Sequence, residues 1–337
     1  MKKIAIWNNY TCFAQNKLFD KNAYLIGEDL WAPYFLLKAK LEERNYILET
    51  FDMDTPDAYD HIIFSDYPNP KTCPHDIYKI PRRKLHLVIS ECEMIYKPNA
   101  NTKLFDIFHT VFTYNDELVK NHGYIKLHSP NRFKAPIQKP FHERKFCTMM
   151  AGNKFSNEHG ELYSERRKII ACFSKNFPEL FDLYGFDWDK KIFHGPRLIR
   201  GLNRIKPLQK ILAPRYPVHR GRLNSKLQTL SQYKYAICYE NTSAIKGYIS
   251  EKIFDCFFAG TIPVYLGCEN ITDHIPENCF IDRRKFQTNE LLIKYLQQLT
   301  EYEYNQYLIA ITNFLQSDKG YVFSDQCFAD VLINTIL

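Results

Sequence analysis

The sequence has no apolar run long enough to cross a membrane, and it has few features that would tie it to an oxidising compartment. Its N-terminus, MKKIAIWNNYTCFAQNK, carries two lysines but only four or five consecutive apolar residues, too few for the core of a signal peptide. The ten cysteines include no Cys-x-x-Cys pair and no Cys/His ligand spacing, so neither a zinc site nor a disulfide framework is expected. We therefore expect a cytoplasmic protein.

Several nucleotide and metal signatures are also missing. The chain contains no G-x-x-x-x-G-K-[ST] phosphate loop, no G-x-G-x-x-G fingerprint and no H-E-x-x-H pair, which argues against an ATPase, a dinucleotide enzyme and a zinc protease. Two Asp-x-Asp triplets, at residues 52–54 and 187–189, are of a type that can hold Mn²⁺. Such short triplets arise by chance in a chain rich in aspartate, so we expect surface acids and no metal site.

What the chain does contain is enough apolar surface for two cores and one concentrated block of positive charge. Its 337 residues are 45% hydrophobic and 15% aromatic, which suits two domains of ordinary size. Residues 190–226 hold eleven Lys/Arg and no Asp/Glu, so the net charge of +7 becomes −4 for the rest of the chain. This basic segment has three interpretations: a solvated loop, a contact with anionic lipid headgroups, or a funnel for acidic substrates.

Strand and helix patterns alternate along the first third of the chain, which predicts an α/β fold with a mostly parallel sheet. A helical pattern covers residues 31–44. The strand-type runs cover residues 3–8, 46–51, 61–64, 85–89 and 111–114. A proline-containing segment then separates this first Rossmann-like domain from a second one. The predicted ranges are 1–130 for the first domain, 131–144 for the linker, 145–322 for the second domain and 323–337 for a C-terminal helix.

The most informative stretch, residues 233–267, reads YKYAICYENTSAIKGYISEKIFDCFFAGTIPVYLG and predicts a strand–helix–strand unit. Residues 233–239 and 262–266 are apolar strand-type runs. Between them, Ser250 is a candidate helix N-cap and Gly260 stands where a glycine commonly ends a helix.

Ligands of parallel α/β sheets bind at the carboxyl ends of the strands, beside the helix N-termini. Here Glu240 and Asn241 end a strand, Tyr248 closes the loop, and Glu251 and Lys252 occupy the first helical turn. A helix N-terminus with a lysine favours phosphate, whereas a carboxylate suits a sugar hydroxyl. The combination indicates a nucleotide sugar, although a capped helix with a solvated Glu-Lys pair has the same pattern.

The string YENTSAIKGYISEKIFDCFFAGTIPVYLG closely resembles the donor-binding motif of the α-1,3-fucosyltransferases of glycosyltransferase family 10. The resemblance implies a GT-B fold, in which two Rossmann-like domains with parallel sheets face a central cleft. It also implies that Asn241, Tyr248, Glu251 and Lys252 bind GDP-fucose, with Glu251 on the ribose and Lys252 on the diphosphate. The first domain would then bind the acceptor and the second the donor.

Two further positions carry expected roles. The strand-end sequence LVISECE, residues 87–93, delivers two carboxylates, and the resemblance implies that Glu91 is the general base, with Glu93 as the fallback. A helix cap and a surface acid are the alternative. In the run Ser-Glu-Arg-Arg-Lys at residues 164–168, the resemblance implies a diphosphate-binding Arg166, although Arg167 is not separable from it by sequence.

The resemblance, taken with these residues, implies an inverting α-1,3(4)-fucosyltransferase that moves L-fucose from GDP-β-L-fucose to a glycan hydroxyl of GlcNAc type. A carboxylate base and cationic groups would suffice for this chemistry, so no metal and no cofactor are expected. A GT-B enzyme using another nucleotide sugar is the alternative. A nucleic-acid-binding protein acting through residues 190–226 is an alternative of another class, but no such motif is present, so no nucleic acid is expected. Contact of the same segment with the inner membrane face is the remaining expectation.

Overall fold

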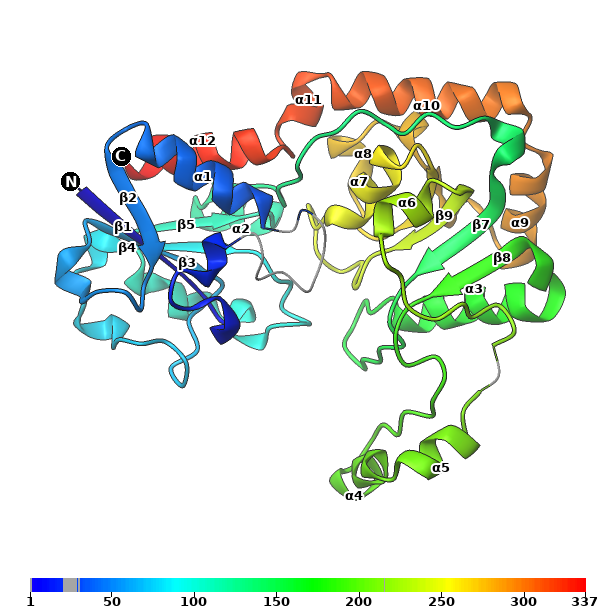
Figure 1. Ribbon diagram of the computed structural model, residues 1–337, viewed down its shortest axis with the longest axis horizontal. Helices are drawn as coiled ribbons and strands as arrows, with labels where there is room; N and C mark the ends of the chain where they lie inside the picture. The colour runs from blue at the N-terminus through cyan, green and yellow to red at the C-terminus, as the bar shows by residue number, and fades with distance from the viewer. Residues whose placement is uncertain (1, 21–28, 30, 215) are drawn as a thin grey trace. The chain divides into compact units, whose positions relative to one another are not determined.

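The computed structural model describes residues 2–20, 29, 31–214 and 216–337. The chain divides into two compact units (Figure 1). Unit 1 comprises Met1–Phe133, Ile245–Glu251 and Leu315–Leu337, and unit 2 comprises Lys134–Ala244 and Lys252–Phe314. Each unit is built on one parallel sheet, as the α/β prediction requires.

Unit 1 contains a six-stranded sheet with the strand order β2-β1-β3-β4-β5-β6, and every described pair is parallel. Its strands are β1 (Lys2–Asn8), β2 (Tyr46–Thr50), β3 (His61–Ser65), β4 (Leu85–Ile89), β5 (Thr110–Thr113) and β6 (Ile125–Lys126). Its helices are α1 (Ala32–Glu42), α2 (Asp116–His122), α11 (Asp318–Tyr321) and α12 (Asp325–Ile336). The predicted strands of the first third of the chain are therefore present, with ends shifted by at most one residue.

The two faces of the unit 1 sheet bury separate cores, because successive side chains of a strand point to opposite faces. Ile4 and Ile6 of β1 pack with α1 and α12, whereas Ala5 and Trp7 belong to the core on the other face. Helix α12 contributes an apolar stripe to the first of these cores. The C-terminal helix is thus part of unit 1, although it was predicted as a separate segment of residues 323–337.

Unit 2 contains a five-stranded parallel sheet with the order β11-β10-β9-β7-β8. Its strands are β7 (Lys145–Met150), β8 (Phe181–Tyr184), β9 (Tyr233–Tyr239), β10 (Ile262–Leu266) and β11 (Ile281–Asp282). Its longer helices are α3 (Tyr163–Asn176), α7 (Glu251–Phe258), α9 (Asn289–Gln298) and α10 (Glu301–Leu315), of which α7 begins and α10 ends at a unit boundary. Its shorter helices are α4 (Arg197–Gly201), α5 (Lys206–Ile211), α6 (Lys226–Leu230) and α8 (Ile271–His274).

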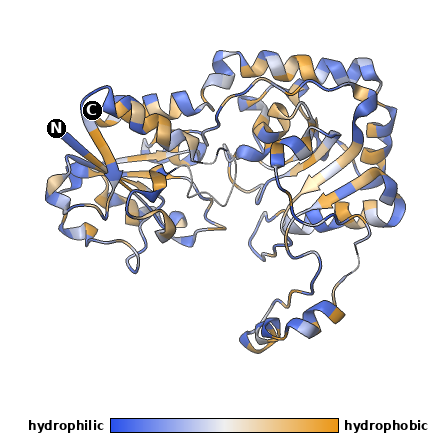
Figure 2. Ribbon diagram, viewed as in Figure 1, coloured by the Kyte–Doolittle hydropathy of each residue, from blue (hydrophilic) through white to orange (hydrophobic). Residues whose placement is uncertain are grey.

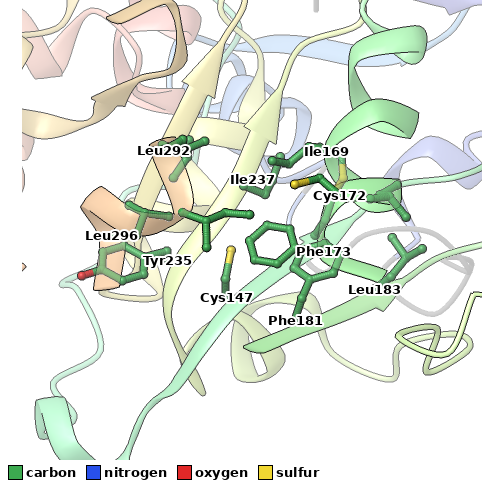
Figure 3. Close-up of a cluster of buried hydrophobic side chains, with 14 of the residues drawn as sticks. Cys147, Ile169, Cys172, Phe173, Phe181, Leu183, Tyr235, Ile237, Leu292 and Leu296 are labelled. Atoms are coloured by element: carbon green, nitrogen blue, oxygen red, sulfur yellow. The ribbon is translucent and has the colours of Figure 1, made fainter. Parts of the chain in front are cut away.

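The core of unit 2 lies between its central strands and helices α3 and α9 (Figure 3). Cys147 of β7 and Ile237 of β9 are buried there with Leu296 of α9. The rings of Phe173 on α3 and Phe181 on β8 stack with centroids 4.3 Å apart. The hydropathy colouring shows the same distribution, with apolar strands in the sheet of this unit (Figure 2). This core fixes β9 and α3, and Arg166 on α3 hydrogen-bonds the carboxyl end of β9.

Candidate functional site

The strand–helix–strand unit predicted from residues 233–267 is present as β9, α7 and β10. The buried face of α7 includes Ile253, Phe254 and Phe257, which explains why an apolar helix begins here. Gly260 follows the helix with φ +63°, and a Cβ at this position would lie 2.3 Å from the carbonyl oxygen of Ile137. Only glycine fits that approach, so α7 ends where the sequence predicted.

Lys252 forms an ion pair with Glu240, the residue that follows β9. The Nζ atom lies 3.1 Å from Glu240 Oε2, and the Glu240 side chain is fully buried whereas that of Lys252 is 27% exposed. A buried carboxylate requires a nearby cation, so Glu240 holds the lysine at the end of the strand. The position of Glu240 at the strand end was predicted from the sequence, but its pairing with Lys252 was not.

A glycine allows Glu240 to occupy its buried position. A Cβ on Gly267, after β10, would lie 2.5 Å from Glu240 Cγ and 2.5 Å from the Tyr265 hydroxyl. The Tyr265 hydroxyl accepts a hydrogen bond from the backbone N–H of Cys268, and burial holds the pKa of Tyr265 well above its ordinary value. The turn after β10 therefore forms one wall of the Glu240 pocket.

Arg166 reaches the same strand end from α3. Its side chain is buried, and Nη2 donates hydrogen bonds to the carbonyl oxygen of Tyr239 at 2.7 Å and to Asn241 Oδ1 at 3.1 Å. The guanidinium also lies 4.9 Å from the ring of Tyr163. The neighbouring Arg167 instead donates to the carbonyl oxygen of Lys154. The structure therefore separates the two arginines that the sequence left equivalent, and it is Arg166 that meets the end of β9.

Arg166 and Lys252 line one small cavity of unit 2, of about 50 Å³. The cavity also contacts the carboxyl end of β7 at Met150 and Ala151. A space of that size holds a water molecule or two, not a nucleoside diphosphate. Lys226 of α6, which pairs with Asp255 at 2.6 Å, lines the cavity as well. The significance of this cavity is that cations from different helices line one space beside the carboxyl ends of adjacent strands, where α/β sheets bind ligands.

A larger cavity in unit 2, of about 350 Å³, contains none of the predicted residues. It is lined by Lys145 and Tyr233, the first residues of β7 and β9, and by residues of α6. We assign it no catalytic role, because the amino ends of parallel strands are not where this class of sheet places its chemistry.

The loop after β9 is held first by unit 2. The backbone N–H of Leu162 donates to the carbonyl oxygen of Asn241 at 3.0 Å, and the N–H of Ser243 donates to the carbonyl oxygen of Gly160 at 2.8 Å. A Cβ on Gly160 would lie 2.7 Å from Ala244 Cβ, so this contact also depends on glycine. Arg166 and Asn241 are thus brought together by the segment that precedes α3.

The same loop then joins the core of unit 1, which the predicted domain range of 145–322 did not anticipate. Ile245 and Tyr248 are buried in that core, and the Tyr248 ring centroid lies 5.3 Å from that of Tyr114. The N–H of Asp116 donates to the carbonyl oxygen of Lys246 at 3.1 Å. Burial of the Ile245 and Tyr248 side chains in the core of unit 1 stabilises this packing. Residues 245–251 therefore group with unit 1, although they follow β9 of unit 2 in the sequence.

Among the predicted donor residues, Tyr248 and Glu251 therefore group with unit 1, and Arg166, Asn241 and Lys252 with unit 2. The Tyr248 side chain hydrogen-bonds the buried thiol of Cys92, whose pKa is raised by burial. Glu251 is the first residue of α7 and is partly exposed. The boundary between the units runs between Glu251 and Lys252.

Glu91 follows β4, and buried polar groups fix its backbone. Asp66, which follows β3, accepts hydrogen bonds on Oδ1 from the N–H groups of Ser90 at 2.8 Å and Glu91 at 2.9 Å. Asn99 donates from Nδ2 to the same oxygen and to the carbonyl oxygen of Glu91, both at 2.8 Å. Burial raises the pKa of Asp66 above its ordinary value, against these hydrogen bonds. This Asp66–Asn99 clamp makes the position of Glu91 a rigid one.

The two candidate carboxylates differ in their surroundings. Glu91 is partly buried, and the Tyr10 hydroxyl near it has a pKa raised by burial first and by the Glu91 charge second. Glu93 is exposed to solvent. A carboxylate that is both partly desolvated and fixed by neighbours is better suited to proton transfer than an exposed one, which favours Glu91 over Glu93.

The sequence analysis named neither Asp66 nor Asn99. Asp66 could have been found, because an acid directly after an apolar strand falls at the same sheet edge as Glu91. Asn99 had no sequence signal, because it lies in a short 3₁₀ helix, Lys97–Ala100, and reaches Glu91 through the fold.

Within the described ranges no group of three or more His, Cys, Asp or Glu side chains has a metal-binding arrangement. In the Asp-x-Asp triplets, Asp54 pairs with Lys3 and Asp187 pairs with Lys190. None of the helices in the described part of the chain is long and apolar enough to span a membrane.

Comparison with known proteins shows which family part of this chain is similar to. Residues 214–314 match the family model described as glycosyltransferase family 10 (fucosyltransferase) C-term. An α-(1,3)-fucosyltransferase of Helicobacter pylori is 32% identical over 113 residues, which make up 33% of this chain and 23% of that protein. The 4-galactosyl-N-acetylglucosaminide 3-α-L-fucosyltransferase 9 of Mus musculus is 39% identical over 75 residues, 22% of this chain and 21% of that one. The chain thus spans less than a quarter of the length of these curated relatives.

The likeness of the fold extends over the whole chain. A solved α1,3-fucosyltransferase with GDP-fucose has a TM-score of 0.54 and 19% identity, covering 99% of this chain and 90% of that chain. At this identity the likeness shows the fold alone, and it confirms the predicted GT-B class. Residues 214–314 therefore carry the C-terminal domain of the glycosyltransferase family 10 fucosyltransferases, which confirms the resemblance predicted from the sequence.

Proposed function

We propose that this protein is an inverting α-1,3(4)-fucosyltransferase that transfers L-fucose from GDP-β-L-fucose to a hydroxyl of a GlcNAc-type glycan. One observation carries the proposal: Arg166 and Lys252 meet at one cavity beside the end of β9, in the unit whose residues 214–314 match the fucosyltransferase model. Two cations at a strand end suit a diphosphate that gains negative charge as it leaves.

The proposed chemistry is a single displacement. The Glu91 carboxylate takes the proton of the acceptor hydroxyl as that oxygen forms a bond to the anomeric carbon of fucose, and the bond from that carbon to the phosphate oxygen breaks. The electron pair stays on GDP, whose diphosphate is neutralised by Arg166 and Lys252. The configuration at the anomeric carbon inverts, so β-linked fucose in the donor becomes α-linked in the product.

Arginine and lysine side chains bind phosphate groups in different ways. An arginine fork offers two parallel N–H donors to phosphate oxygens, whereas a lysine supplies a compact charge. Arg166 is anchored by Tyr239 and Asn241, and Lys252 by Glu240, so both cations are oriented before a ligand arrives. Because the cations are already oriented, little free energy is needed to reorient them as negative charge develops on the leaving group. Glu251 is assigned to the ribose hydroxyls, as the family resemblance implies.

The test is a transfer assay with GDP-fucose and a panel of glycans that end in GlcNAc or N-acetyllactosamine. The proposal requires GDP release that depends on the acceptor, together with a product heavier by one deoxyhexose and α-linked by NMR. UDP-glucose and CDP-linked sugars serve as donor controls. Transfer from one of these donors but not from GDP-fucose would overturn the donor assignment and favour a GT-B enzyme with another nucleotide sugar.

A further inference from the structure

The first part of the basic segment, residues 190–212, projects from unit 2 and carries two short helices at its tip (Figure 1), whereas Val218 is buried in the core of the unit. Helices α4 and α5 are connected through a 3₁₀ turn, Leu202–Arg204. The residues that match the family model begin at 214, after the tip.

The interior of this tip is polar. Asn203 donates from Nδ2 to the carbonyl oxygen of Phe193 at 2.8 Å and accepts from the N–H of the same residue at 2.9 Å. Gln209 is buried, donates from Nε2 to Asn203 Oδ1 and to the carbonyl oxygen of Lys191, and accepts at its own carbonyl from the Lys191 N–H. An amide clasp, and not an apolar core, therefore holds the tip together.

The aliphatic side chains of the tip face solvent instead. Leu198 on α4 is 89% exposed and Ile211 on α5 is 79% exposed. Ile199, Ile205 and Leu212 are also among the exposed large apolar residues. Single exposed aliphatic residues are common on protein surfaces, but five within fifteen residues, on an element with a polar interior, indicate a surface that is covered by a partner.

The charge of the tip identifies the chemistry of that partner. Arg197, Arg200, Arg204, Lys206 and Lys210 are exposed, and in the described part of the chain no carboxylate forms an ion pair with any of them. Aliphatic side chains interspersed with cations match the interface of an anionic bilayer, where cations meet headgroups and aliphatic groups enter the acyl boundary. The phosphates of a nucleic acid would bind the cations, but a nucleic acid has little apolar surface against which the exposed leucine and isoleucine side chains could be buried.

We propose that the tip formed by residues 197–212 docks unit 2 onto anionic lipid surfaces, with Leu198 and Ile211 entering the bilayer interface. The inference does not rest on the transferase activity. Each cation near such a surface is expected to contribute about fivefold to the partition coefficient, so neutralising three lowers it on the order of 100-fold. Removing one inserted aliphatic side chain lowers it on the order of tenfold.

Vesicle co-sedimentation tests the proposal with phosphatidylglycerol/phosphatidylcholine vesicles and pure phosphatidylcholine vesicles. The wild-type chain should bind the anionic vesicles, bind the neutral ones weakly, and lose affinity as salt is raised. Binding should fall on the order of 100-fold in the triple variant Arg197→Gln/Arg200→Gln/Arg204→Gln. It should fall on the order of tenfold for each side chain replaced in the double variant Leu198→Ser/Ile211→Ser.

Matched controls change the same chemistry elsewhere on unit 2. Lys168→Gln/Lys175→Gln/Lys294→Gln removes three exposed cations, and Leu291→Ser/Ile309→Ser removes two exposed aliphatic groups. Both controls should retain vesicle binding within about threefold, since none of these residues lies on the tip. Loss of binding in the controls equal to that in the tip variants would refute a role specific to the tip.

Two further measurements test the proposal with readouts other than co-sedimentation. Anionic vesicles should protect the wild-type chain from trypsin at the arginines of the tip, whereas neutral vesicles should not. A gel shift with duplex DNA and single-stranded RNA at the same salt provides the competing outcome. Nucleic-acid binding that needs the three arginines but not Leu198 and Ile211, with no vesicle binding, would overturn the lipid proposal.

Discussion

Replacing Lys252 by methionine removes the ammonium that lies 3.1 Å from the Glu240 carboxylate and keeps most of the side-chain volume. At an effective dielectric constant of about 20, unit charges at that distance attract by about 5 kcal/mol. Because Glu240 is fully buried, losing this cation leaves a desolvated carboxylate, and single truncations of this kind cost about 3–5 kcal/mol. We therefore expect Lys252→Met to lower the free energy of unfolding by about 3–5 kcal/mol.

A double-mutant cycle separates this pairing from a simple packing loss. In Glu240→Gln/Lys252→Met neither charge remains, so the double variant should be at least about 2 kcal/mol more stable than the sum of the single losses predicts. Urea unfolding followed by circular dichroism measures the four proteins. The exposed pair Lys168–Glu165, 2.6 Å apart, is the control and should give a coupling energy below about 1 kcal/mol. A coupling below about 0.5 kcal/mol for Glu240 and Lys252 would refute the view that Glu240 holds the lysine.

Three further expectations concern the base, the arginine and pH. Glu91→Gln should lower kcat about 10²–10⁴-fold while leaving GDP affinity intact in calorimetry, and equal loss in both would argue for a structural role. Arg166→Lys should weaken GDP binding by about tenfold or more, because a lysine cannot reproduce a fork, whereas Arg167→Lys should not. Buried His86 has its pKa lowered to about 3, by burial first and by the charges of nearby histidines. Its unfolded pKa is near 6.5, so the stability present above pH 6.5 falls as pH falls toward 3, by about 2 kcal/mol at pH 5. Urea midpoints at pH 7.5 and 5.0 should show this slope, and His86→Gln should reduce it; an unchanged slope in the variant would exclude His86 as the cause.

Much of the fold could be predicted because it rests on local chemistry. The strand at residues 85–89 and the helix that ends before Gly260 were recognised from apolar periodicity and from a glycine at the helix end. Residues 245–251 were misplaced in the predicted second domain, because their place in unit 1 depends on Ile245 and Tyr248 entering a core built from distant segments. For these residues, burial in a distant core determines the unit to which they belong, and their neighbours in the sequence do not.

The candidate site, like the fold, could be predicted only in part from the sequence. The first-turn position of Lys252 and the early helical position of Arg166 were predicted, because helix starts are visible in the sequence. The partners that orient such side chains were not, since Glu240 and Lys252 lie twelve positions apart in the sequence and Asn99 lies eight positions after Glu91. These contacts depend on backbone paths that local patterns do not encode.

Calorimetric titration of the full chain with GDP, and with UDP and CDP as competitors, tests the central claim most directly. We expect saturable GDP binding that is tighter than the binding of UDP or CDP and is weakened by Arg166→Lys. The absence of GDP binding, or binding of all three nucleotides with equal affinity, would contradict a guanosine-specific donor site in this protein.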